Sequence, residues 1–449
     1  MNFLQDTIVA RATPPGNGGV GIVRLSGSGA VDLVERFFRP VTGGSLSAVP
    51  PRYMIHGIIT WDGDIVDRCL AVRFEGPASF TGEDVVELHL HGNQLIIDQV
   101  LRLSVACGAR LATAGEFSRR AFMNGKMDLV QVEALGDFIA AESEQALYIS
   151  QRQFHGEFRR KLEAFRGSLV TTLAALELEL DFVEDGYHFA SDDELQSLLR
   201  DLSDFCDGLL SSYHLGNRLR KGPRVLLLGK PNAGKSSLFN AFLGYSRSLV
   251  SAQAGTTRDY IEELIHYRGI AFHLIDTAGL RETVDAIEAE GVGYARDLIA
   301  LSDHVFYLID SSDTSSIDSE LAAVDVLRRS HPHSRIVPIF TKVDIADGAS
   351  DHLGCSILHP QSLTPILDLL AESYSSALSD AMVLLNERQF ALLNDIQQQL
   401  ASIRSGVIPG TEFLSADLRQ LLDPLSLLSG AVTNDDILNT LFSSFCIGK

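Results

Sequence analysis

The chain has 449 residues, of which 45% are hydrophobic, and a formal net charge of −21. This length indicates two to four domains with genuine cores. The acidic balance gives no support for binding nucleic acid through bulk electrostatics, so an RNA contact would require a local basic patch or a basic partner protein.

The five cysteines are scattered along the chain and form no Cys-x-x-Cys pair, which favours a reducing compartment over a disulfide framework. The N-terminal residues lack the basic start and the long apolar core of a signal peptide. The chain also lacks a run of about 18 apolar residues, so we expect a cytoplasmic protein with no membrane-spanning helix.

Residues 1–120 are predicted to form a mixed α/β domain, because short β-rich runs alternate with glycine and proline. The expected strands are Thr7–Thr13, Val20–Leu25, Tyr53–Trp61, Ile65–Phe74 and Asp84–His91, and the expected helices are Ala30–Phe38 and Gln94–Ala106. His89 and His91 alternate on one strand, but no third ligand follows at a metal-binding spacing, so a metal site is disfavoured.

Residues 121–218 and 379–449 are predicted to be mainly helical, because leucine and other apolar residues recur there at helical spacing. The expected helices include Ser191–Asp207, Ala381–Ile403 and Phe413–Phe445. Between these flanks, residues 219–378 alternate apolar strands with helical runs, which is typical of a doubly wound parallel sheet. We therefore predict one discontinuous helical domain with an α/β nucleotide domain inserted into it.

A phosphate-binding loop opens the inserted domain. The pattern Gly-x-x-x-x-Gly-Lys-Ser lies on Gly229, Gly234, Lys235 and Ser236, between an apolar run and the start of a helix. In that setting backbone N–H groups and the helix N-terminus attract an anion, the lysine reaches the β- and γ-phosphates, and the serine hydroxyl ligates Mg²⁺. The alternative is a simple glycine-rich turn, which the strand, loop and helix together make less plausible.

Two downstream segments correspond to the switch segments of a nucleotide-dependent protein, which are ordered by the γ-phosphate and released on hydrolysis. A threonine hydroxyl in Gly255–Asp259 can complete the Mg²⁺ shell, and Asp276–Gly279 offers a carboxylate for a Mg²⁺-bound water and an N–H for the γ-phosphate. Thr341–Asp344 follows the next strand, and Asp344 can accept hydrogen bonds from the N1–H and 2-amino group of guanine, which adenine lacks. Lys342 can lie along the base. The alternative for this quartet is an ordinary polar strand end.

Several segments outside the nucleotide motifs resemble the MnmE (TrmE) family of tRNA-modification GTPases. The segments are Thr7–Ala10, Ala12–Gly16, Ser79–Asp84, Gly115–Ser118 and the tail Phe445–Lys449. The resemblance runs from residue 7 to the last residue and implies the family's domain order: a tetrahydrofolate-binding-like α/β domain, a discontinuous helical domain and an inserted Ras-like G domain.

The resemblance also implies a function. Family members form homodimers through the N-terminal domain and join the flavoprotein MnmG in a heterotetramer. Together they modify C5 of the wobble uridine of tRNA with an aminomethyl or carboxymethylaminomethyl group, using a one-carbon unit from 5-formyl- or methylene-tetrahydrofolate. GTP hydrolysis in the family requires Mg²⁺ and K⁺, and the cation takes the place of an arginine finger.

Site residues follow from the resemblance by position. The implied GTP contacts are Asn232, Ala233, Gly234, Lys235, Ser236, Ser237, Ser251, Thr256, Thr257, Asp276, Thr277, Ala278, Gly279, Thr341, Lys342, Asp344 and Ser356. The implied metal ligands are Ser236 and Thr257 for Mg²⁺, and Asn232, Ser251, Gln253 and Thr256 for K⁺. The implied folate contacts are Arg24, Glu87, Lys126 and Lys449.

Two further residues are implied to be catalytic. Glu288 matches the family's water-orienting glutamate, although spacing alone favours a solvated helix-face charge. Cys446 in the tail matches a cysteine near the folate pocket with a suspected part in the modification chemistry, whereas a lone cysteine is more often a small buried hydrophobe.

The chain departs from the family pattern at two positions that concern the base. Thr341 replaces the asparagine of Asn-Lys-x-Asp, which in the family ties the base-reading loop to the phosphate loop and touches the base. The later Ser-Ala-Lys-like segment is reduced to Ser356–Leu358. Asp344, the residue expected to distinguish guanine from adenine, is present, so GTP is expected over ATP. An ATPase, and a regulatory GTPase acting in ribosome assembly, remain the alternatives.

Overall fold

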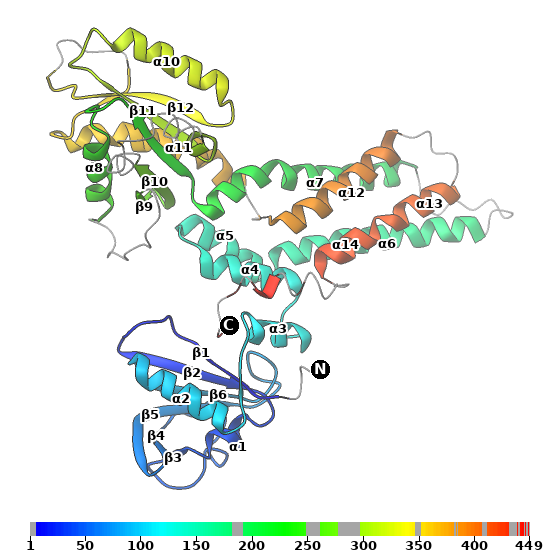
Figure 1. Ribbon diagram of the computed structural model, residues 1–449. Helices are drawn as coiled ribbons and strands as arrows, with labels where there is room; N and C mark the ends of the chain where they lie inside the picture. The colour runs from blue at the N-terminus through cyan, green and yellow to red at the C-terminus, as the bar shows by residue number, and fades with distance from the viewer. Residues whose placement is uncertain are drawn as a thin grey trace. The chain divides into compact units, whose positions relative to one another are not determined.

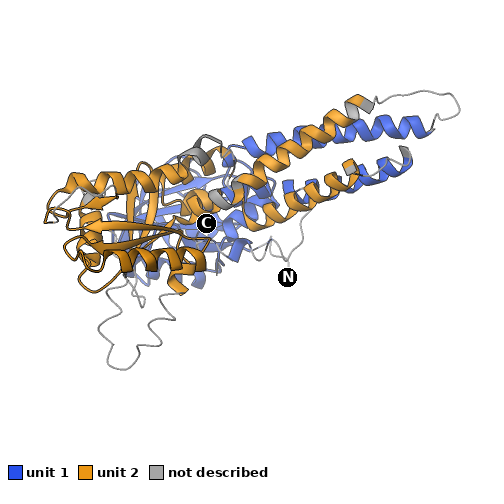
Figure 2. Ribbon diagram, turned by 90° about the horizontal axis from the view of Figure 1, so that it is seen from above, with its two compact units in different colours: residues 1–136, 153–190, 407–449 blue, residues 137–152, 191–406 orange. Residues whose placement is uncertain are grey.

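The computed structural model describes residues 6–181, 192–247, 261–276, 297–345, 352–380, 385–405 and 411–430, with residues 383, 438, 441–443, 445 and 448. Two compact units account for the chain: one holds Met1–Gly136, Gln153–Ala190 and Val407–Lys449, and the other holds Asp137–Arg152 and Ser191–Gly406 (Figure 2). None of the described helices is long and apolar enough to cross a membrane. The three domain boundaries expected from the sequence, after residues 120, 218 and 378, stay a prediction.

A seven-stranded sheet in the order β3-β4-β5-β6-β2-β1-β7 forms the N-terminal part of the first unit (Figure 1). Its strands are β1 (Ile8–Arg11), β2 (Val20–Ser26), β3 (Phe38–Pro40), β4 (Ile55–Trp61), β5 (Asp64–Phe74), β6 (Val85–His91) and β7 (Arg110–Leu111). Its helices are α1 (Ala30–Val34), α2 (Gln94–Ala106) and α3 (Glu116–Met123). The five expected strands are present. The expected helix Ala30–Phe38 is shorter than predicted, because Phe38 begins β3 and is buried there.

Alternation along the central strands separates a core face from a polar face. In β6, Val86, Leu88 and Leu90 are buried in the core, where they join Ile97 and Val100 of α2. The intervening residues of β6 lie on the opposite face, where they face their partners on β2 in antiparallel register. This register brings polar groups from separate strands together on that face.

Glu116 at the start of α3 is the centre of a buried ion-pair network. Its Oε1 accepts hydrogen bonds from Arg110 Nη2 at 2.6 Å and Arg120 Nη2 at 3.1 Å, and its Oε2 accepts one from the Thr113 N–H at 2.9 Å. Arg120, only 2% exposed, also contacts Asp6. Breaking such a buried network by removing one partner strongly destabilises a protein.

The stability of the N-terminal part is expected to depend on pH through Glu116. Burial acts to raise the pKa of this carboxyl, but hydrogen bonds from Arg110, Thr113 and Arg120 outweigh burial and lower the pKa to about 2. A carboxyl with a lowered pKa stabilises the folded state above its unfolded pKa, and this stabilisation is lost as pH falls toward the folded pKa. The free energy of unfolding, measured with denaturant, should therefore fall less between pH 7 and pH 3 for Glu116→Gln than for the parent. Equal losses would contradict this role.

Long helices form the rest of the first unit and one side of the second. They are α4 (Leu129–Ala140), α5 (Glu144–Phe154), α6 (Glu157–Asp181), α7 (Asp192–Lys221), α12 (Glu387–Ser405), α13 (Thr411–Gln420) and α14 (Leu422–Ser429). In the first unit α6 packs against α13 and α14, and in the second α7 packs against α12, where Tyr213 stacks on Phe390 with ring centroids 4.0 Å apart.

Three predictions in the helical regions differ from the structure in extent. The expected helix Ala381–Ile403 begins only at Glu387, as α12, since residues 383, 385 and 386 are not helical, and it continues to Ser405. The expected helix Ser191–Asp207 continues to Lys221 as α7. The expected helix Phe413–Phe445 is interrupted at Leu421, because Pro424 lies in the first turn of α14, where it cannot continue a preceding helix. Gly430, with φ of 80°, ends α14.

A six-stranded sheet in the order β13-β12-β11-β8-β10-β9 forms the nucleotide domain of the second unit (Figure 1). Its strands are β8 (Arg224–Gly229), β9 (Ile261–Tyr267), β10 (Ile270–Asp276), β11 (His304–Asp310), β12 (Arg335–Thr341) and β13 (Gly354–Cys355). The described helices against it are α8 (Lys235–Arg247), α10 (Ile317–Ser330) and α11 (Thr364–Asp380).

All neighbouring strands of this sheet are parallel except β9, which pairs antiparallel with β10. Two buried clusters cover opposite faces: one joins the sheet to α8 and α11, and the other joins it to α10. The doubly wound parallel sheet is confirmed. The strand β9 was not predicted, since its polar residues Glu262, Glu263 and His266 interrupt the apolar run expected of a buried strand.

Candidate nucleotide and folate sites

The phosphate loop joins the carboxyl end of β8, a central strand, to the N-terminus of α8. Three of its residues have left-handed backbone: Gly229 (φ 148°), Asn232 (φ 65°) and Gly234 (φ 92°). At Gly229 a Cβ atom would lie 2.5 Å from the carbonyl oxygen of Leu308, so only glycine fits between the two strands. Turns of this kind direct successive backbone N–H groups to one side, where they form a concave anion site. The structure confirms the strand–loop–helix setting that the sequence predicts.

Lys235 is held within this loop. Its Nζ donates to the carbonyl oxygens of Gly229 and Lys230, both at 2.8 Å, and the residue is only 8% exposed. These contacts fix the ammonium group inside the curl of the loop. The next residue, Ser236, is exposed in the first turn of α8, where its hydroxyl is accessible to a cation.

Asp276 is the last residue of β10, which runs parallel to β8 with Asp276 opposite Leu227. Parallel strands bring their carboxyl ends to the same edge of the sheet, so this buried carboxylate lies on the edge that carries the phosphate loop. The other expected switch and tail residues lie outside the described residues: Ser251, Gln253, Thr256, Thr257, Thr277, Ala278, Gly279, Glu288, Cys446 and Lys449.

Thr341, the departure from the family motif, connects the base-reading segment to the phosphate loop. Its Oγ1 donates to the carbonyl oxygen of Ala233 at 2.8 Å, with a second contact to that of Ile309 at 3.2 Å. The threonine hydroxyl thus provides the link between the two loops that the family's asparagine was expected to make. The sequence alone did not indicate that a threonine would make this link, because the two residues are 108 positions apart.

Lys342 follows in a left-handed conformation (φ 57°), and its Nζ contacts Asp310 Oδ2 at 2.5 Å. Partial burial acts to raise the pKa of Asp310, but the hydrogen bonds from Lys342 and Ser312 lower it, so the carboxylate stays charged beside the lysine. Asp310 ends β11 and therefore positions the lysine stem at the edge of the sheet where a base would lie.

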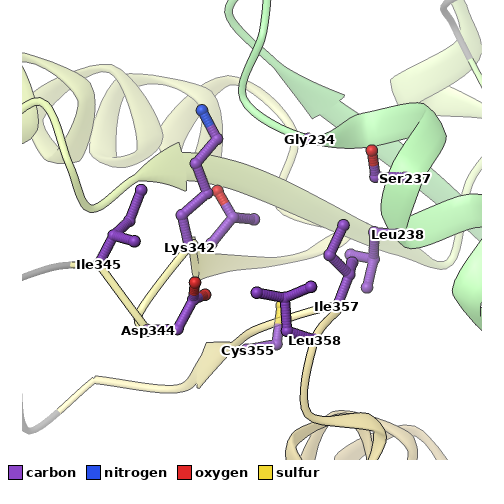
Figure 3. Close-up of a pocket in the computed structure, with 10 residues that line it drawn as sticks. Gly234, Ser237, Leu238, Lys342, Asp344, Ile345, Cys355, Ile357 and Leu358 are labelled. Atoms are coloured by element: carbon purple, nitrogen blue, oxygen red, sulfur yellow. The ribbon is translucent and has the colours of Figure 1, made fainter.

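Asp344 lies across a hollow from the phosphate loop. A hydrogen bond from Ser356 is the main cause that lowers the pKa of Asp344, so the carboxylate is kept ionised as an acceptor. Figure 3 shows Lys342, Asp344, Ile357 and Leu358 arranged around the hollow. The cavity measures about 260 Å³ and is lined by Gly234, Ser237, Leu238, Thr341, Lys342, Asp344, Ile345, Cys355, Ile357 and Leu358.

The composition of this hollow suits a flat aromatic base. Aliphatic side chains, including Leu238, Ile345 and Leu358, form its walls, and Asp344 supplies a charged acceptor at one side. Ligand sites commonly combine an apolar lining with a few placed polar groups. The structure therefore brings together Gly234, Ser237 and the three predicted residues of the base-reading segment.

A second polar site lies on the N-terminal sheet, opposite α2. Arg24 Nε donates to Glu87 Oε1 at 2.8 Å, and the two residues face each other across β2 and β6. The guanidinium also lies 5.9 Å from the ring centre of Phe80 and 5.8 Å from that of Phe117. The Gly448 carbonyl oxygen of the tail is 3.5 Å from Arg24 Nη1. Two expected folate residues and the chain's tail thus meet.

Lys126 is placed near this site by the loop that carries Phe80. Its Nζ donates to the carbonyl oxygen of Pro77 at 2.8 Å, and its side chain is exposed. The sequence did not indicate the aromatic contacts of Arg24. Phe80 and Phe117 lie within two quoted family segments, but their proximity to the arginine depends on the fold.

The two histidines of β6 each contact a carboxylate. His89 Nε2 lies 3.3 Å from Glu87 Oε2, and His91 Nδ1 lies 2.7 Å from Asp67 Oδ1. Among the described residues, no group of three or more His, Cys, Asp or Glu side chains could hold a metal ion.

Comparisons with known proteins cover the whole chain. The family model "GTP-binding protein TrmE N-terminus" matches residues 7–126, and the "MnmE helical domain" model matches residues 129–446, across the inserted nucleotide domain. A structural likeness to the G domain of the FeoB iron transporter of T. maritima has 23% identity and a TM-score of 0.26, covering 33% of this chain and 97% of that one.

Curated relatives named "tRNA modification GTPase MnmE" match at full length. The protein of Chlorobaculum tepidum is 38% identical, over 98% of this chain and 97% of the relative. That of Syntrophus aciditrophicus is 36% identical over all of both chains, and that of Aquifex aeolicus is 34% identical over 99% of this chain and 100% of the relative. The chain therefore belongs to the MnmE (TrmE) family of tRNA modification GTPases.

Proposed function

We propose that the protein hydrolyses GTP to drive modification of the wobble uridine of tRNA. The observation that carries this proposal is the joint geometry of the phosphate loop and the base hollow, linked by the hydrogen bond from Thr341 to Ala233. Lys235 would bind the β- and γ-phosphates, and Asp344 would accept the two donors of guanine. Adenine offers neither donor, so an ATPase is disfavoured.

Mg²⁺ and K⁺ would stabilise the negative charge that develops during transfer of the phosphoryl group. Ser236 fits a Mg²⁺ ligand, because its hydroxyl is exposed beside the phosphate loop. Asn232 fits a K⁺ ligand, because it is exposed at the outer turn of that loop. Thr257, Ser251, Gln253 and Thr256 would complete the two shells, and Glu288 would orient the attacking water.

The N-terminal site would hold a tetrahydrofolate that donates the one-carbon unit. The pair Arg24–Glu87 presents one cationic and one anionic group beside the Phe80 and Phe117 rings. A pterin offers donors and acceptors on its edge and a flat face to aromatic groups, and its glutamyl carboxylate suits lysines such as Lys126 and Lys449. Cys446, two residues before Gly448, would act in the modification chemistry near this site.

This function implies partners. The protein would form a homodimer through its N-terminal domain, join the flavoprotein MnmG in a heterotetramer and act on tRNA in the cytoplasm. Mass analysis of tRNA nucleosides from cells lacking the protein tests this directly. Loss of the modified wobble uridine is expected, whereas normal wobble uridines would refute the proposal and favour a regulatory GTPase of ribosome assembly.

The variant Cys446→Ser tests whether GTP hydrolysis and wobble-uridine modification depend on different residues. Because the cysteine belongs to the tail and not to the nucleotide domain, the variant is expected to hydrolyse GTP at the parental rate while wobble modification falls to the level of a deletion. Both are measured on the same preparation, by phosphate release and by nucleoside mass analysis. Loss of hydrolysis in this variant would contradict the separation of roles.

A further inference from the structure

Glu320 lies on the face of α10 that packs against the sheet of the nucleotide domain, where an apolar side chain would be usual. It precedes Val324 by four residues and Leu327 by seven, so the three share one side of the helix. Val324 and Leu327 belong to the cluster that joins α10 to the sheet, and Glu320 is likewise buried, with 3% of its surface exposed. Glutamate is rarely buried unless it is paired, so this position requires an explanation.

Lys230 of the phosphate loop is a partner of opposite charge for Glu320. Its Nζ lies 3.2 Å from Glu320 Oε1, which also accepts a hydrogen bond from Ser316 Oγ at 2.9 Å. Leu226 and Leu228 of β8 pack on the α10 side of the sheet, and the alternation of side chains along a strand directs Lys230 to that side as well. The ion pair therefore joins the first turn of α10 to the start of the phosphate loop.

The backbone of the same lysine supports the loop from within. The carbonyl oxygen of Lys230 accepts hydrogen bonds from Lys235 Nζ at 2.8 Å and from the Ala233 N–H at 3.3 Å. Lys230 is thus tied to α10 through its side chain and to the rest of the phosphate loop through its backbone. A carboxylate outside the loop, that of Glu320, therefore contacts the residue around which the loop curls.

This ion pair is poorly suited to stabilising the fold. The Lys230 side chain is 52% exposed, and ion pairs with so exposed a member contribute little to stability. Glu320 Oε2 is buried and has no hydrogen-bond partner within the described residues, which is costly for a carboxylate. Asp313 also lies near the lysine, but it is fully exposed and, in the part of the chain that the structure describes, forms no ion pair with it. Glu320 is therefore the acid that holds the Lys230 side chain.

We propose that Glu320 is a positioning residue for GTP, which holds Lys230, and through it the phosphate loop, in the conformation that receives the phosphates. The inference rests on the proposed assignment of this loop to the phosphates of GTP. A loop that is already held in its bound conformation loses less conformational freedom when the ligand binds, so preorganisation increases affinity. Bound phosphates hold the loop themselves, so hydrolysis of bound GTP depends on Glu320 less than the affinity does.

The variant Glu320→Gln removes the charge and keeps the size of the side chain. In the full-length protein the equilibrium affinity for GTP should fall roughly threefold to tenfold. The affinity for GDP should fall by a similar factor, because the loop contacts phosphates that both nucleotides carry. Single-turnover hydrolysis at saturating GTP should stay within about twofold of the parent. The melting temperature should not fall, because the released Lys230 side chain can turn into water and no unpaired buried charge remains.

The matched control is Asp318→Asn. Asp318 lies in the same first turn of α10, is exposed, and carries a charge that suits the positive end of the helix, as that of Glu320 does. This control should bind GTP and GDP as the parent does. If Glu320 serves only the end of the helix, both variants should lower the melting temperature and neither should change the nucleotide affinities, which would overturn the proposal.

Variants of Lys230 test whether the two residues act as a pair. Lys230→Met should weaken GTP binding as much as Glu320→Gln does, and it should also lower the melting temperature, because it leaves the buried carboxylate unpaired. The double variant should recover the melting temperature and bind GTP no more weakly than either single variant. Lys230→Arg should keep the parental affinity, since its guanidinium can still pair with Glu320. Additive losses of affinity in the double variant would contradict the pairing.

Three other outcomes overturn the proposal for different reasons. If Lys230→Met weakens GTP binding and Glu320→Gln does not, the lysine acts on the phosphates directly and Glu320 does not position it. If both variants bind GTP as the parent does while Lys235→Ala binds it more weakly, the loop is the GTP site but α10 does not position it. If Lys235→Ala also binds GTP as the parent does, the assignment of the loop to GTP fails, and the role of Glu320 fails with it.

Discussion

Replacing Asp344 with asparagine is expected to lower the affinity for GTP by about 10²–10⁴-fold and to create affinity for xanthosine triphosphate. The carboxylate would accept two hydrogen bonds from guanine, and hydrogen bonds to a charged group contribute about 1.5–3 kcal/mol each. An asparagine amide donates instead, which opposes the 2-amino group of guanine but suits the C2 carbonyl of xanthine. Equilibrium binding of GTP and of xanthosine triphosphate measures this change in selectivity.

The matched control is Asp313→Asn, an exposed aspartate in the turn after β11 that does not line the base hollow. This control should bind GTP as the parent does. Unchanged GTP affinity in Asp344→Asn, or ATP competing as well as GTP on the parent, would show that the base is read elsewhere.

Replacing Lys235 with alanine is expected to reduce GTP turnover by about 10²–10³-fold, the usual effect of removing one preorganised donor to developing charge. The ammonium group is held in the loop by the Gly229 and Lys230 carbonyl oxygens, so it needs no reorganisation to meet the phosphates. Single-turnover hydrolysis at saturating GTP measures the effect apart from binding.

Lys221→Ala serves as the control for lost lysine charge, because Lys221 is exposed at the end of α7, just before β8. It should turn over GTP at the parental rate. A Lys235→Ala protein that remains fully active, with an unchanged melting temperature, would exclude the phosphate loop as the site of hydrolysis.

Local features of the site could be predicted from the sequence, because they depend on consecutive residues. The phosphate loop is such a case: the strand, the glycines and Lys235 lie within a dozen positions, and the conformations of Gly229 and Gly234 follow from the lack of a side chain. The base-reading residues were likewise predictable as a short motif at the end of an apolar strand.

Contacts between distant positions could not be predicted in the same way. The bond from Thr341 to Ala233 replaces an expected asparagine contact with a shorter side chain, and only the approach of β12 to the phosphate loop makes it possible. The pairing of Arg24 with Glu87 depends on the register of β2 and β6, which a shift of one residue would abolish. The network around Glu116 and Arg120 has the same non-local origin.

GTP turnover compared in K⁺ and Na⁺ buffers of equal ionic strength tests most directly the proposal that a K⁺-assisted GTP site drives this protein. Asn232, exposed in the phosphate loop, is the one predicted K⁺ ligand within the described residues. GTP turnover is expected to be much faster in K⁺ than in Na⁺, with that difference reduced in Asn232→Ala. Equal turnover in the two buffers would contradict the role of Asn232 and the K⁺-dependent mechanism.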